Sequence, residues 1–181
     1  MPGMRIDLTI DDKITPELQA KARRLQSFRE PLVQAQALML RSVDQNFRSD
    51  GRPKWPPLAP STVAQRRKGS SRPLQDTGRL RVSVTAQDGT GAVRTVNDSV
   101  AIIGTTVKYA RLMQEGGTIN VPALTPKRAK ALRWIGGGGA VHFARRTKAH
   151  TVSIPARPFL LFQAEDERRI VTIFRRYIEG A

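Results

Sequence analysis

The chain has 181 residues, 39% of them hydrophobic, which predicts a single domain with a modest core. Its 31 Lys and Arg outnumber its 15 Asp and Glu, and the net charge of +16 favours a polyanion or an acidic protein as partner. The sequence has no cysteine, which excludes disulfides, thiol catalysis and a cysteine zinc site. It also lacks a long apolar run and a signal-peptide pattern, so we expect a soluble protein that stays in the cytoplasm where it is made.

The N-terminal quarter predicts a short strand followed by a long helix. Residues 5–10 alternate between polar and apolar side chains, which is the period of a half-buried strand. Residues 15–17 are Thr, Pro and Glu, the types favoured at the cap and in the first turn of a helix. Beyond Pro31 apolar residues recur every three or four positions, so we expect the helix to reach Phe47 with a kink or break at the proline.

A proline-rich loop follows the predicted helix and contains Trp55. Prolines at positions 53, 56 and 57 prevent regular structure there, and a tryptophan in such a loop usually pins the loop to its domain. Residues 60–62 then begin a short basic helix, which is expected to end near Gly69.

The sequence pattern of residues 80–103 predicts an antiparallel meander. Three strands are expected, at residues 80–86, 92–96 and 100–103. The turn residues at 88–89 and 97–99 separate them. A short helix from Tyr109 to Glu115 is expected to end at the glycine pair 116–117.

Two stretches contain no acidic residue, 51–75 and 116–164. The second holds four consecutive glycines at 136–139, and we expect residues 118–150 to form a long basic arm or hairpin with a glycine tip. No Gly-Lys-Ser or Gly-Lys-Thr follows these glycines, so they are not a phosphate-binding loop. The cations of this arm are expected to face DNA or an acidic partner protein: Lys127, Arg128, Lys130, Arg133, Arg145, Arg146 and Lys148.

The chain is expected to close with a strand, a rigid turn and a helix. Residues 150–154 have a strand pattern, and the prolines on either side of Arg157 stiffen the turn that follows. The closing helix, 165–178, has acidic residues in its first turn and arginines near its end, as the helix dipole favours. Its buried stripe is expected to comprise Ile170, Ile173, Phe174 and Tyr177.

No group of residues supports catalysis or cofactor binding. The two histidines, His142 and His150, have neither cysteines nor nearby carboxylates to complete a metal site. The carboxylates at 165–167 are neighbours on a helix and point to different faces, which does not suit paired acid-base work. We therefore expect no enzymatic activity, no cofactor, no metal and no small-molecule substrate.

Four stretches of the sequence carry a resemblance. They are Trp55-Pro56-Pro57-Leu58 with Thr62 and Lys68, residues 74–80 (Leu-Gln-Asp-Thr-Gly-Arg-Leu), Tyr109-Ala110 with Glu115-Gly116-Gly117, and residues 154–160 (Ile-Pro-Ala-Arg-Pro-Phe-Leu). Together and in this order, they resemble the virion-morphogenesis, or tail-completion, family of Mu-type tailed phages. The last stretch is the most specific of the four.

The resemblance implies an α+β fold, in which a long N-terminal helix and a C-terminal helix pack on a mostly antiparallel sheet. It implies a structural virion protein that assembles with itself into a ring, with six subunits expected, around the DNA channel at the neck. Adjacent neck, connector or tail-terminator rings would be its partners. Contact with genomic DNA would be nonspecific, because neutralising phosphates releases counterions whatever the sequence. The protein would leave the host cytoplasm within the assembled virion.

Most residues of the four stretches have structural explanations, since their glycines and prolines set turns. Those expected at a subunit or partner interface are Trp55, Tyr109, Arg157 and Phe159. Arg157 is the foremost of them, because a guanidinium in a stiff turn can bind a carboxylate or main-chain carbonyls. The alternative function is a monomeric accessory protein that binds DNA or RNA without sequence preference, which the charge alone equally allows.

Overall fold

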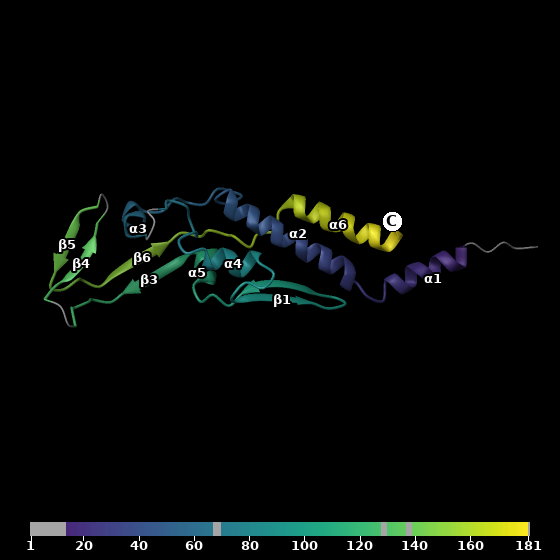
Figure 1. Cartoon of the computed structure of the whole chain (residues 1–181), viewed down its shortest axis with the longest axis horizontal. Helices are drawn as coiled ribbons and strands as arrows, with labels where there is room; N and C mark the ends of the chain where they lie inside the picture. The colour runs from purple at the N-terminus through teal and green to yellow at the C-terminus, as the bar shows by residue number, and fades with distance from the viewer. Residues whose placement is uncertain (1–13, 67–69, 128–129, 137–138, 181) are drawn as a thin grey trace, which may run out of the picture.

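The computed structural model describes residues 14–66, 70–127, 130–136 and 139–180. The molecule is elongated, with the helices of both termini at one end and paired strands reaching to the other (Figure 1). The strand predicted at 5–10 lies outside the described residues. Within the described ranges, no helix is long and apolar enough to cross a membrane.

Two helices replace the single kinked helix predicted near the N-terminus. Helix α1 (Ile14–Arg24) and helix α2 (Arg29–Arg48) are separated by residues 25–28, so the break precedes Pro31 instead of falling at it. Pro31 lies in the first turn of α2, where it is tolerated because the first-turn amides have no acceptor within the helix. Helix α1 has no buried residue.

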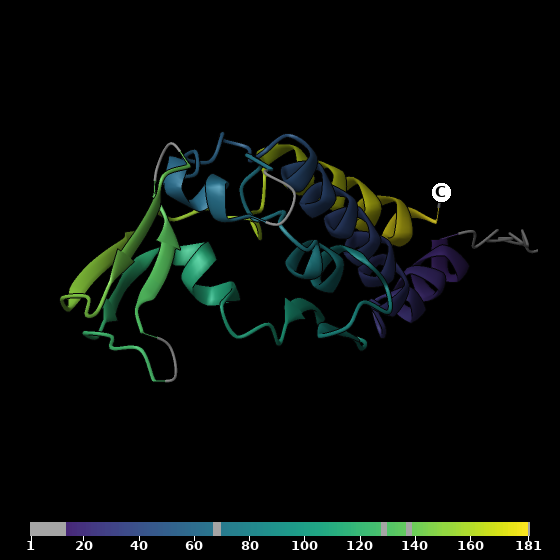
Figure 2. The same cartoon turned by 60° about the vertical axis from the view of Figure 1, so that its left-hand side comes forward.

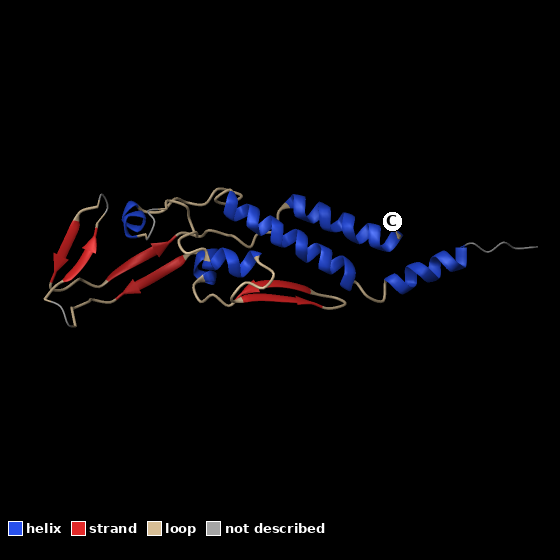
Figure 3. Cartoon of the chain, in the orientation of Figure 1, coloured by secondary structure: helices blue, strands red, loops and turns tan. Residues whose placement is uncertain are grey.

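The core is built by α2, the segment that becomes the helix at residues 79–85, and the loops around Trp55 and Phe159. Helix α6 (Ala164–Glu179) lies beside α2 and confirms the predicted closing helix (Figure 3). Its predicted buried stripe is only half-buried, because this face covers α2 at the edge of the core: Ile170, Ile173, Phe174 and Tyr177. Phe47 is fully buried, with its ring centroid 5.5 Å from that of Trp55 and 5.8 Å from that of Phe159. Such aromatic packing dominates core energetics, since each fully buried side chain contributes about 1.5–3 kcal/mol. The rest of the core cluster comprises Val43, Leu80, Val84, Val107 and Ala110.

A buried polar network joins α2, the proline-rich loop and the start of α6. Asp166 is 2% exposed, and its carboxylate accepts hydrogen bonds from Ser42 Oγ at 2.6 Å and from the Gln163 amide at 3.1 Å. Arg52 donates to Ser42 Oγ at 2.8 Å and to Asn46 Oδ1 at 2.8 Å. Asp166 therefore caps α6 and also anchors it to α2.

The strand predicted at 80–86 is instead helix α4 (Arg79–Thr85). Leu80, Ser83 and Val84 are buried, a spacing of three and four residues that places them on one helical face, while Val82 is 48% exposed. The apparent alternation of this segment was a short helical pattern, and seven residues are too few to tell the strand period from the helix period. The meander is consequently a hairpin of β1 (Ala92–Val96) and β2 (Ala101–Thr105), joined at the predicted 97–99 turn.

Two further short helices lie between the core and the strands. Helix α3 (Pro60–Gln65) begins at Pro60, as predicted. Helix α5 (Ala110–Glu115) ends at Gly116, whose φ of 73° suits glycine. A side chain at position 116 would also meet the Ala156 backbone nitrogen at 2.7 Å, so only glycine lets the two segments approach this closely.

The remaining strands form two antiparallel pairs, β3 (Gly117–Val121) with β6 (His150–Ile154) and β4 (Leu132–Ile135) with β5 (Val141–Ala144). The predicted α+β class is confirmed, but its single sheet is wrong, because the described strands form three separate two-stranded sheets. Short pairs of this kind carry little core of their own, so the core comes mainly from helices α2 and α4 and from the loops that hold Trp55 and Phe159.

Candidate functional site

The end of the molecule opposite the terminal helices is strongly basic. We call residues 117–154, with strands β3 to β6, the basic extension; it projects away from α2 and α6 (Figures 1 and 2). Its sequence contains no carboxylate side chain. The predicted cations that the structure describes are all exposed and form no ion pair with another described residue: Lys127, Lys130, Arg133, Arg145, Arg146 and Lys148. Arg128 lies outside the described residues.

The β4–β5 hairpin also exposes apolar side chains on both faces. Trp134 faces His142 across the pair, with ring centroids 5.6 Å apart and planes 18° apart, and it is 40% exposed. On the other face, Phe143 lies opposite Arg133 and is 66% exposed. A hydrogen bond from Gln65 Nε2 to the Ile135 carbonyl, at 3.2 Å, links the hairpin to α3. An exposed two-stranded pair of this kind is marginally stable alone, and this one presents two aromatic side chains to solvent.

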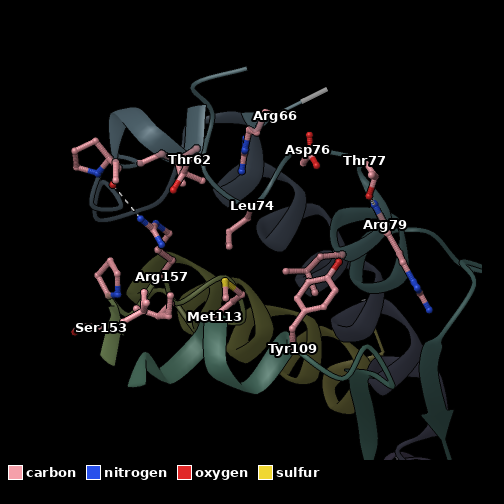
Figure 4. Close-up of a pocket in the computed structure, with 17 residues that line it drawn as sticks. Thr62, Arg66, Leu74, Asp76, Thr77, Arg79, Tyr109, Met113, Ser153 and Arg157 are labelled. Atoms are coloured by element: carbon pink, nitrogen blue, oxygen red, sulfur yellow. Dashed lines mark hydrogen bonds between the residues drawn. The ribbon is translucent and has the colours of Figure 1, made fainter. Parts of the chain in front are cut away.

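A groove of about 810 Å³ lies between α3, α5, β6 and the loop before α4 (Figure 4). We call it the α3–β6 groove. Its lining is mostly apolar and includes Leu58, Leu74 and Met113, with the aromatic ring of Tyr109 at one side. The charged residues of the lining are three cations and one carboxylate: Arg66, Arg79, Arg157 and Asp76. The groove therefore suits an apolar ligand that carries negative charge.

All four stretches that carry the family resemblance meet at this groove. Each stretch contributes to the lining: Pro57 and Leu58 from the first, residues between Leu74 and Leu80 from the second, Tyr109 from the third, and Ile154, Pro155 and Arg157 from the fourth. The groove was not predicted, because segments up to about a hundred positions apart form it. Their shared membership in the resemblance was the signal that could have grouped them.

Arg157 is held inside its own chain. Its side chain is 5% exposed, and it donates from Nε to the Pro56 carbonyl at 2.9 Å and from Nη2 to the Pro57 carbonyl at 3.0 Å. Its backbone amide donates to the Met113 carbonyl at 2.8 Å. Burial lowers the pKa of Arg157, and the nearby positive charge of Arg66 lowers it further. The expected grip on main-chain carbonyls is present, but it fastens the proline-rich loop of the same chain.

The other residues predicted at an interface divide between core and surface. Trp55 is 6% exposed and donates from Nε1 to the Pro158 carbonyl at 3.0 Å, and Phe159 is 1% exposed. These two, like Arg157, have little surface to offer a neighbour, and the structure gives them a role in this chain's own fold. Tyr109 is 42% exposed at the groove and remains available for contact.

Gln114 is a positioning residue that the sequence analysis missed. Its Oε1 accepts the Phe159 and Leu160 amides at 2.9 and 3.0 Å, and its Nε2 donates to the Leu160 carbonyl at 2.9 Å. These three bonds hold the most specific stretch of the resemblance against α5. No sequence pattern marks a glutamine for this role.

The histidines lie on different strand pairs, His142 on β5 and His150 on β6. Among the described residues, no group of three or more His, Cys, Asp or Glu side chains is placed to hold a metal ion. The arrangement is that of a binding surface, basic and apolar, built next to a stable helical core.

The chain matches the phage virion morphogenesis family over residues 10–179. It is 28% identical over 177 residues to the Mu-like prophage FluMu G protein 2 of Haemophilus influenzae, and the match covers 97% of this chain and 96% of that protein. No solved structure matches the chain significantly. The family's role in virion morphogenesis implies a structural rather than an enzymatic protein. This chain therefore belongs to the phage virion morphogenesis family.

Proposed function

We propose that this protein is a component of the phage neck, where it completes the tail or joins it to the head as a ring around the DNA channel. The observation that carries the proposal is the basic extension, whose exposed cations have no carboxylate within their own segment. A ring of subunits would bring several such extensions together. Their summed field would act on phosphates without reading bases, as a channel that passes a whole genome requires.

Family membership and the exposed surfaces support self-assembly. The family takes part in virion morphogenesis, in which structural proteins act as assembled parts. The exposed apolar side chains of α1 and of the β4–β5 hairpin lie at opposite ends of the molecule (Figure 1). Head-to-tail contact between different surfaces of one chain generates rings when the rotation closes. The same surfaces would serve contact with adjacent neck, connector or tail-terminator rings.

A second candidate function is a monomeric accessory protein that binds nucleic acid without sequence preference. One observation favours it: Trp134 is exposed beside the cation Arg133 and stacks on His142, as in platforms that stack unpaired bases. The family match favours the neck protein over this alternative, because an accessory protein need not remain in the virion.

The position of the protein in the virion tests the proposal. Purified virions should contain it in a few copies, and gold-labelled antibody should mark the junction of head and tail. Particles made without it should accumulate as separate heads and tails. Its absence from purified virions, together with monomers in light scattering at every concentration, would instead support the accessory protein. Label at the far tip of the tail would contradict both functions.

A further inference from the structure

We propose that the α3–β6 groove binds residues 5–12 of a second copy of this chain, which add a strand along the free edge of β6. The proposal rests on the proposed self-assembly and specifies one contact between neighbouring subunits. Groove and segment are different parts of the chain, so the contact is head-to-tail and can close into a ring.

The groove presents an unpaired strand edge beside an apolar floor. Strand β6 pairs with β3 along one edge, and no described strand pairs with its other edge. Residues 152–154 of β6 line the groove opposite α3. Free backbone amides and carbonyls at such an edge are ready to pair with an extended peptide, whose alternate side chains then enter pockets. Leu58, Leu74 and Met113 would cover those side chains.

Residues 5–12 have the pattern that such an edge accepts. Their sequence is Arg-Ile-Asp-Leu-Thr-Ile-Asp-Asp, and Ile6, Leu8 and Ile10 would fall on one face of a strand. An eight-residue strand of about 26 Å is long enough to run past all of β6, which has five residues. The strand predicted from the alternation of residues 5–10 would thus pair with β6 of a neighbouring copy.

The net charge of residues 5–12 fits the groove better than that of the other exposed apolar parts of the chain. It holds three carboxylates and one guanidinium, a net charge of −2 in a chain of +16. The groove lining holds three cations, Arg66, Arg79 and Arg157, and one carboxylate, Asp76, a net charge of +2. Because Arg157 is buried, Arg66 and Arg79 are the cations that a bound segment can meet directly. Opposite charges favour encounter and suppress wrong partners. The β4–β5 hairpin of a neighbour is a poor occupant, because it is basic like the groove.

The shape of the molecule indicates that the segment comes from another copy. Helix α1 lies at the end of the molecule opposite the β4–β5 hairpin, and its start points outward (Figures 1 and 2). The start of α1 and the groove of the same chain therefore lie far apart along the molecule. A neighbouring copy can present its residues 5–12 directly.

Cysteine cross-linking tests the contact, because the chain has no cysteine to give background. One protein would carry Ser153→Cys, on β6, and a second would carry a cysteine at one of positions 6 to 10 in turn. The two would be mixed, mildly oxidised and separated without reductant. Heterodimers are expected only at alternate positions, since a disulfide needs Cα atoms within about 7 Å and a strand alternates its faces. The matched control replaces Ser153→Cys with Ser99→Cys, in the β1–β2 turn.

Charge reversal adds a second measurement that leaves the groove intact. The Asp7→Lys, Asp11→Lys, Asp12→Lys variant should reduce cross-linking to Ser153→Cys several-fold, most strongly at low salt. Cross-linking equal to the Ser99→Cys control, or unaffected by the three lysines, would overturn the proposal. A disulfide within one chain at high dilution would overturn the assignment to a second copy.

These outcomes separate the inference from the proposed function. Oligomers at the head–tail junction without the cross-link would refute the strand contact and leave the neck protein standing. The cross-link in a protein located elsewhere in the virion would refute the neck position and leave the contact standing.

Discussion

The core around Phe47 buries its large apolar side chains within the chain, whereas the β4–β5 hairpin of the basic extension leaves its two aromatic side chains exposed. Phe47 and Phe159 are 0% and 1% exposed, but Phe143 and Trp134 of the β4–β5 hairpin are 66% and 40% exposed. The first region therefore carries its own stability, and the second has surface that gains stability only when something covers it.

Charge divides the same two regions. At the helical end Asp44 pairs with Arg48 and Arg81 at 2.6 and 2.7 Å, and Asp50 pairs with Arg72 at 3.0 Å. The basic extension has no carboxylate to pair with its cations. Exposed pairs contribute only about 0–1 kcal/mol each, so the difference matters less for stability than for the field each end presents.

The strongest test of this division truncates one phenylalanine in each region. Phe47→Ala should lower the free energy of unfolding by about 3–5 kcal/mol, because it leaves a cavity beside Trp55 and Phe159. Phe143→Ala should change it by no more than about 0.5 kcal/mol in the monomer, since the side chain is largely in solvent. Urea denaturation at low protein concentration measures both. Equal losses in the two variants would show that the hairpin folds as part of the core.

The next effect concerns Arg157, which follows the basic extension and fastens the proline-rich loop. Arg157→Ala should cost roughly 1–3 kcal/mol of monomer stability, because the Pro56 and Pro57 carbonyls lose a charged donor. Arg157→Lys should recover only part, since an ammonium lacks the planar fork that reaches both carbonyls. Arg133→Ala, on the exposed hairpin, is the control and should be nearly neutral. A stable alanine variant that fails only in assembly would restore the original prediction of an intersubunit contact.

Local opening of the basic extension should cost less free energy than unfolding of the helical core, because its strand pairs bury little apolar surface. Local opening should expose its loops to trypsin, which cleaves after lysine and arginine, before α2 or α6 is cut. The first sites are expected at Lys127, Arg145, Arg146 and Lys148. Assembly should slow these cuts, because neighbours would cover the extension. Equal cleavage rates in monomers and assembled particles would show that the extension stays exposed.

Sequence patterns predicted the parts of this fold that depend on local chemistry. The closing helix, the helix start at Pro60, the turn at 97–99 and the end of α5 at Gly116 all follow from caps, turn residues and periodicity. The strand predicted at 80–86 was wrong, because over so short a segment the spacing of the apolar residues fits both the strand period and the helix period. In the folded chain Leu80 and Val84 pack into the core, and this tertiary packing favours the helix over the strand.

The candidate site was predictable in its charge and not in its geometry. The lack of acidic residues over 116–164 marked the basic extension directly. The α3–β6 groove depends on Leu58, Leu74, Met113 and Ile154, which meet only after folding. The burial of Arg157 was equally hidden, because its partners are backbone carbonyls about a hundred residues away, and carbonyls leave no mark in a sequence.

Substitution of the exposed cations should have the smallest effect on folding, because only DNA binding should change. Replacing Arg145, Arg146 and Lys148 together with glutamine should leave stability intact, because all three are exposed and unpaired among the described residues. If each meets a phosphate, the log–log dependence of DNA affinity on salt should flatten by about 0.9 per contact, or about 2.7 in all.

The matched control replaces Arg168, Arg169 and Arg175 of α6 with glutamine; these arginines are exposed, and their replacement changes the net charge equally. Its slope should stay close to that of the unmodified protein, since these arginines lie at the helical end. Equal flattening in both variants would mean that total charge, and not the extension, binds DNA. An unchanged slope with loss of head–tail joining would instead place an acidic protein ring against these cations, and a strong preference for one DNA sequence would argue against a channel.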